Sequence, residues 1–291
     1  MNEENINLTE IILNSINELF SKIFSSVDNS IYSVLDDITF VNSDILSTNA
    51  FQKILGNSSS DGILLICNSL LLGFIIYYAI NYLISHLTYS KIDSPKQFIF
   101  KCVIFIAIMN SSFWICEEII NIVSIVTNGI SEIGLDLFNS KINFSNFINN
   151  INQNIYLSQE SFTIFSFDGI IKSFISFGLV NLVFTYSLRY IMIQIFVLLS
   201  PFAFLSLITN SSEWFFKVWI KTFLSLLLVQ ILISLILLLS FSIELTPNSN
   251  LSKILYIGII YALTKSNIFM KELFGGISLN VTASVSNFSK N

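Results

Sequence analysis

The sequence has few of the residues that usually carry catalysis or bind metals. Its 291 residues include one histidine, three cysteines and a single arginine, Arg189, against thirteen lysines. His86 stands alone, without the cysteines, histidines or carboxylates that would complete a metal site. The sequence has no glycine-rich phosphate-binding loop, and the adjacent acids Glu117 and Glu118 point to different sides of a helix. We therefore expect a protein that is not an enzyme and that binds no metal and no cofactor.

Charged residues are scarce as well, which argues against an ordinary soluble domain. They make up 11% of the chain, whereas a soluble domain has about 25%. The mean hydropathy is +0.74, and several apolar runs approach or exceed the roughly 20 residues that a helix needs to cross a bilayer. The predicted fold class is therefore all-α, a polytopic membrane helix bundle with five or possibly six spans and an N-terminal amphipathic helix.

The apolar pattern divides the chain into five parts. The amphipathic helix is expected over residues 6–26, where apolar side chains recur at helical spacing, and it should lie on the membrane or on a partner. The parts are the N-terminal segment 1–61, a first transmembrane hairpin 62–116, a polar loop region 117–169, a transmembrane core 170–270 and a polar tail 271–291.

The charge distribution predicts the orientation of the chain in the membrane. Residues 1–61 carry nine acids and two lysines, and residues 117–169 carry six acids and one lysine. Residues 84–101 carry three lysines and one aspartate. Because basic loops stay on the cytoplasmic side, we expect 84–101 inside and the two acidic regions outside.

The stretch RYIMIQIFVLLSPFAFLSLI, residues 189–208, decides the number of spans. If 170–188 and 190–208 both cross, the chain has six spans and the lysines after residue 210 lie outside, against the charge rule. If 190–208 enters and returns or lies obliquely, there are five spans. Pro201 lacks an amide hydrogen and clashes with the preceding turn, which favours five spans, an external N-terminus and a cytoplasmic C-terminus in the plasma membrane.

Arg189, Pro201, Gln230 and Asn181 are the candidate channel or packing residues. A charge inside a span costs about 2.5–3.5 kcal/mol, so it usually faces the bundle or an aqueous path. The alternative is an anchor at the inner surface. Gln230 and Asn181 are possible polar partners of Arg189, and such pairs more often join helices than conduct a solute.

The stretch NSSEWFFKVWIK, residues 210–221, is typical of a helix that enters the membrane. Asn210 could cap this helix with Glu213 reaching back to it. The alternative is a docking surface for a cytoplasmic partner, which would use four residues. They are Glu213, Lys217, Trp219 and Lys221.

Residues 170–245 resemble the TrbL-type, or VirB-type, channel subunits of type IV secretion systems. The resemblance rests on Arg189 with an aromatic residue after it, the run LLSPFAFLSL, the motif KVWIKTF, and a long apolar span with Gln230 inside it. Many larger members of that family have a long soluble C-terminal region, which this sequence does not contain. The scarcity of arginine beside lysine is typical of A/T-biased coding and suggests a mobile element in a low-G+C Gram-positive host.

The resemblance implies a scaffold and conduit for DNA and protein translocation during conjugation. It implies other secretion-system membrane subunits and ATPases as partners, a translocated DNA–protein substrate in transit, an oligomeric assembly and the lipid bilayer. The alternative is a small-solute transporter or permease subunit. That class predicts ionisable residues at matched positions of two repeats, and the sequence shows no internal repeat.

Overall fold

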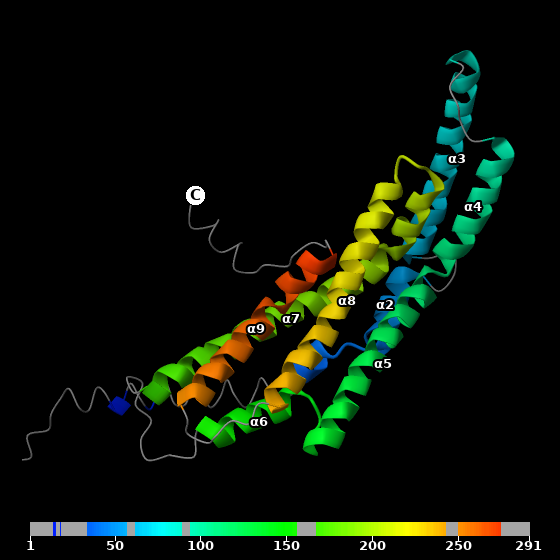
Figure 1. Ribbon diagram of the computed structural model, residues 1–291. Helices are drawn as coiled ribbons and strands as arrows, with labels where there is room; N and C mark the ends of the chain where they lie inside the picture. Colours follow the sequence, from blue (N-terminus) through cyan, green and yellow to red (C-terminus); the bar gives the residue numbers. More distant parts are fainter. Residues whose placement is uncertain are drawn as a thin grey trace, which may run out of the picture.

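The computed structural model describes residues 14–15, 18, 34–56, 62–88, 94–155, 167–242 and 250–274, and in this part of the chain the only regular secondary structure is helical (Figure 1). Most of the predicted amphipathic helix 6–26, and all of the tail after residue 274, lie outside the described residues. The helices are α2 (Asn49–Leu55), α3 (Gly62–Thr88), α4 (Pro95–Asn110), α5 (Ser112–Phe138), α6 (Phe144–Ile155), α7 (Phe167–Leu205), α8 (Glu213–Ser242) and α9 (Asn250–Phe274), with short 3-10 turns η1 (Ser43–Leu46) and η2 (Ser206–Ile208).

Helix α8 is the centre of the bundle. It packs against α5, α7 and α9. Figure 1 shows α7 and α8 running antiparallel, with α9 beside them and parallel to α7. Within the described residues four helices are long and apolar enough to cross a membrane, and they are α3, α5, α7 over 169–198, and α8. The protein is therefore an all-α membrane helix bundle.

The four helices differ in how much of their surface the bundle covers. In the most apolar stretch of each helix, 56% of α8 is buried, whereas only 11% of α3 is buried. The exposed side chains of α3 are mostly large and apolar, such as Leu72, Ile76 and Leu83. In a bilayer these side chains face lipid, which is as apolar as they are.

Helix α7 differs from the predicted arrangement of residues 170–208. It is one continuous helix of 39 residues that passes through both Arg189 and Pro201, so the expected re-entry or break in this stretch is wrong. Pro201 leaves the carbonyl of Val197, four residues earlier, without its helical donor. The Ser200 hydroxyl donates to that carbonyl at 2.7 Å. Because Ser200 replaces the missing donor, the helix continues to Leu205.

Because α7 is one helix, residues 170–208 hold one candidate span and not two, which bears on the conflict over the lysines. Figure 1 places the C-terminal end of α3, the N-terminal end of α4 and the turn between α7 and α8 at one end of the bundle, here called the α7–α8 end. Among the described residues, the lysines at the start of α4 (Lys96 and Lys101) and at the start of α8 (Lys217 and Lys221) therefore lie towards the same end of the bundle. Helix α6 lies at the opposite end, here called the α6 end. That the α7–α8 end is cytoplasmic stays a prediction.

Two other stretches differ from the sequence-based expectation. The second half of the predicted hairpin 62–116 is divided at Ser111 into α4 and α5. Helix α5 continues past Glu117 and Glu118 to Phe138, as the amphipathic pattern there allows. The polar loop region contains α6, which buries Phe144, Phe147, Ile148 and Ile151. Asparagine and serine suggested a loop here, but the spacing of these apolar residues is helical.

The buried side chains form two cores that meet near Arg189. The first core, towards the α7–α8 end, includes Ile193, Trp219 and the three free cysteines. The second core, towards the α6 end, includes Tyr186 and Ile233. Arg189 lies between Tyr186 and Ile193 on α7, so a polar layer separates two apolar cores.

Replacing Gly178 with leucine should detach α9 from α7. A Cβ atom at Gly178 would lie 2.4 Å from the side chain of Ile260 on α9, and close packing at small residues is what holds membrane helices together. We expect lower resistance of the purified protein to thermal unfolding in detergent. Gly73→Leu is the matched control, because nothing lies within 4 Å of a Cβ at Gly73. Equal stability of the two variants would contradict this role of Gly178.

Candidate functional site

A segment far from the core in sequence lies inside the bundle. Residues 34–46, here called the strap, are helical over 34–39, have no regular secondary structure at Val41 and Asn42, and end in η1. Leu35, Thr39, Val41 and Leu46 are at most 1% exposed. The strap meets α7 and α8 within their candidate spans. Backbone that is not helical is tolerated at such depth only where protein or water covers it.

Arg189 binds the strap through main-chain carbonyls. It is 0% exposed, and its Nη2 donates to the carbonyl of Ile38 at 3.3 Å and to the carbonyl of Thr39. Its Nη1 donates to the carbonyl of Leu226 on α8 at 3.4 Å. The last carbonyls of a helix lack helical donors and carry partial negative charge. Arg189 therefore caps the C-terminal end of helix 34–39 with a positive charge.

Two glutamines hold the rest of the strap. Gln230, also 0% exposed, accepts from the amide of Val41 at 3.1 Å and donates to its carbonyl at 3.3 Å. Gln194 donates to the carbonyl of Ile45 at 3.2 Å. All of these contacts are to main-chain atoms, so three polar side chains of α7 and α8 satisfy backbone groups that the strap's own structure leaves unpaired.

The strap in turn organises α6. The carboxylate of Asp36 accepts from the amides of Phe144 and Ser145 at 2.6 and 3.2 Å, and from the hydroxyl of Ser145 at 2.6 Å. Free amides and the helix dipole make the first turn of a helix a favourable place for a negative charge. Asp36 therefore links the strap to the α6 end. Arg189 and Gln230, in contrast, link the strap to the central helices α7 and α8.

Replacing Asp36 with alanine should lower the free energy of unfolding by about 1–3 kcal/mol, because two amides of α6 lose a charged acceptor. Asp37→Ala is the matched control. It removes the same charge from the next residue, whose side chain is exposed. The measurement is denaturant unfolding in detergent, followed by circular dichroism. If both variants lose the same stability, the loss is an effect of net charge and not of the cap.

The predicted candidates do not all meet. Arg189 and Gln230 bind the same strap, but in the described part of the chain no hydrogen bond joins them to each other or to the side chain of Asn181. Asn181 is half-buried on α7, and its carbonyl accepts from the Thr185 hydroxyl at 2.8 Å. Pro201 is buried near the α7–α8 end, away from the strap contacts.

Trp219 belongs to the core and not to a docking surface. It is 2% exposed, and its Nε1 donates to the carbonyl of Phe196 on α7 at 2.9 Å. Its ring lies 5.6 Å from Phe204 and 5.3 Å from Phe223. A tryptophan is usually buried only where its N–H finds an acceptor, and here the carbonyl of Phe196 on α7 is that acceptor. Including Trp219 in the predicted docking surface was therefore wrong.

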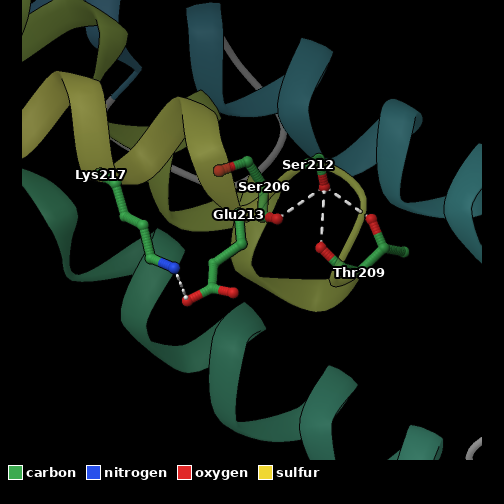
Figure 2. Close-up of polar contacts among 5 residues, drawn as sticks. All are labelled: Ser206, Thr209, Ser212, Glu213 and Lys217. Atoms are coloured by element: carbon green, nitrogen blue, oxygen red, sulfur yellow. Dashed lines mark hydrogen bonds and ion pairs between the residues drawn. The ribbon is translucent and has the colours of Figure 1, made fainter.

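The other three docking candidates do lie on the surface of α8. Lys217 binds Glu213 at 3.0 Å, with both side chains largely exposed, and Lys221 is exposed. Exposed pairs at this spacing contribute about 0.3–0.5 kcal/mol. Figure 2 shows this ion pair beside the turn that precedes α8.

The cap predicted at Asn210 is not formed, because α8 begins three residues later, at Glu213. The turn is held by Ser212, whose hydroxyl donates to the carbonyl of Ser206 at 2.6 Å and lies 2.6 Å from the hydroxyl of Thr209 (Figure 2). These hydrogen bonds lie within the turn itself and stabilise the connection from η2 to α8.

The sequence pattern missed Asp36 and Gln194 as site residues. Asp36 lies in a polar, loosely patterned stretch, and its partners are more than 100 residues away, so no local signal marks it. In the described residues no group of three or more histidine, cysteine or carboxylate side chains is placed to hold a metal ion. The arrangement as a whole can fix a segment in the membrane. No known protein family, curated protein or solved structure matches the chain.

Proposed function

We propose that this protein is an integral membrane subunit of a conjugative type IV secretion system, serving as scaffold and conduit wall for DNA and protein. One observation carries the proposal. The motif LLSPFAFLSL, at the end of α7 and in η2, and the motif KVWIKTF on α8 pack against each other through the rings of Phe204 and Trp219, 5.6 Å apart. Trp219 also donates to the carbonyl of Phe196, just before the first motif. The resemblance therefore rests on residues that form one structural unit, and not on scattered matches.

In this proposal the protein contributes structure and separate ATPases contribute energy. Arg189 belongs to the scaffold, since its guanidinium is buried and bound to main-chain carbonyls. The conduit is then formed with further copies or with other membrane subunits. The basic α7–α8 end, with Lys217 and Lys221 exposed, is the side that faces the cytoplasmic ATPases.

The test is mating efficiency in a strain that lacks the gene. We expect deletion to abolish transfer and the wild-type gene to restore it. Trp219→Ala should restore transfer poorly and lower the amount of protein in the membrane, because truncating a buried tryptophan costs about 3–5 kcal/mol. Trp214→Ala is the matched control, since Trp214 is 64% exposed. Normal transfer without the gene would overturn the proposal, and a loss of solute uptake in its place would favour the permease alternative.

A further inference from the structure

A surface hollow at the α6 end is separate from the strap and from the α7–α8 turn. It has a volume of about 460 Å³, within the range of about 300–1,000 Å³ that small-molecule sites have. The C-terminal ends of α5 and α8 form one side of it and α6 forms the other. It is lined by Phe138, Ser140, Asn146, Asn149, Asn150 and Phe241.

The lining is neutral, polar and aromatic. A charged ligand would lose hydration here without meeting an opposite charge on a lining side chain, which is unfavourable. Amides and hydroxyls both donate and accept hydrogen bonds, as sugar hydroxyls do. The rings of Phe138 and Phe241 lie 6.4 Å apart, tilted by 32°, and offer apolar surface to the C–H face of a sugar ring. The lining thus matches a neutral saccharide better than an ion.

The polar groups of the hollow are held in place before any ligand arrives. The side chain of Asn146 donates through its Nδ2 to the carbonyl of Lys141 at 2.9 Å. The main-chain N–H of Asn146 donates to the Oδ1 of Asn143 at 2.9 Å. This fixes the side chain and leaves its Oδ1 to accept. On the other face of α6, Phe147 and Ile151 are 1% exposed, so the helix that carries Asn149 and Asn150 is anchored in the second core. Side chains that are already held in their binding positions favour the binding of a ligand.

We propose that this hollow binds a neutral saccharide ring. Exposed apolar side chains lie within two residues of the lining phenylalanines on α5 and α8, with Leu137 at 66% and Leu239 at 61%. A sugar carried on a lipid would therefore place its acyl chains along α5 and α8. The same ring chemistry also occurs in cell-wall glycan strands, so the ligand has two sources that the experiment separates. The inference does not depend on the secretion proposal.

The experiment uses the full-length protein in lipid nanodiscs. One arm compares discs of phosphatidylglycerol with discs that also contain diglucosyl-diacylglycerol, and native mass spectrometry measures retained glycolipid. The other arm titrates an N-acetylglucosamine oligosaccharide by calorimetry. We expect the double variant Asn146→Ala/Asn149→Ala to bind about tenfold more weakly, since it loses two amide contacts. Asn110→Ala is the matched control, because it removes an exposed amide from the last residue of α4, far from the hollow.

Each result decides a different point. Retention of glycolipid identifies a headgroup as the source, and binding of the oligosaccharide identifies a glycan strand, provided that the double variant weakens it. No binding in either arm, or equal binding by the double variant, overturns the proposal. Asn149→Leu serves if the double variant unfolds, because Asn149 is exposed and the change leaves the first turn of α6 intact. Mating efficiency is a separate readout, so loss of sugar binding with normal transfer leaves the secretion proposal standing.

Discussion

Replacing Arg189 with leucine is expected to lower the free energy of unfolding by about 2–3 kcal/mol and to release the strap. The carbonyls of Ile38 and Thr39 lose their charged donor, and hydrogen bonds to charged groups contribute about 1.5–3 kcal/mol each. Leucine also removes a buried charge, which offsets part of the loss. Lysine keeps the charge but lacks the planar fork that reaches several carbonyls at once, so Arg189→Lys should also be unstable.

Denaturant unfolding in detergent measures the stability of these variants, and thiol labelling of Val41→Cys measures release of the strap. Val41 is 1% exposed, so its thiol should react only after the strap has left the bundle. Lys221→Leu is the control, since it removes an exposed basic side chain from α8. Wild-type stability of Arg189→Lys would show that the residue is a topological anchor, which is the alternative that the sequence left open.

Gln230→Leu is expected to cost about 2–4 kcal/mol, because it leaves both main-chain groups of Val41 buried without a partner. Each such group costs about 1–3 kcal/mol. Leucine has nearly the same size, so the cavity term is small. The variant Gln230→Glu should be at least as unstable, since it loses the donor and adds a buried charge.

The double variant Arg189→Leu/Gln230→Leu tests whether the two residues act through the strap. They do not touch each other, so independent effects would add. If both act by holding the strap, the first substitution releases it and the second has little left to remove. We therefore expect the double variant to be only slightly less stable than the worse single variant. Simple addition of the two losses would show that each residue has its own structural role.

The helices and the polar residues differ in how far the sequence predicts them. Apolar length was sufficient to predict the helix that opens the hairpin 62–116, which is α3, and the long apolar span that contains Gln230, which is α8. The rule for proline failed at Pro201, because the rescue by Ser200 depends on side-chain geometry that the sequence pattern does not specify. The asparagines of α6 led to the prediction of a loop, although the spacing of its apolar residues is helical.

The candidate site was predicted by residue type but not by partner. Arg189 and Gln230 were predicted as site residues because burying a charge or an amide in a span is unfavourable. Both are fully buried. Their partners are main-chain atoms of residues 38–41, and every residue carries the same main-chain groups. No sequence pattern distinguishes those residues as partners, so the strap was predicted only as part of an external segment, without contacts to the helices.

The separation in sequence between the strap and its receiving helices sets the order of assembly during synthesis. Arg189 and Gln230 lie 150 and 189 residues after the strap atoms that they bind. At roughly 5–20 residues per second, the ribosome needs about 10–40 s to make that stretch. Until then the strap has no receptor, and chains that stop before α8 never acquire one. Docking of the strap is thus a late event in biogenesis, and it reports that α7 and α8 have been inserted together.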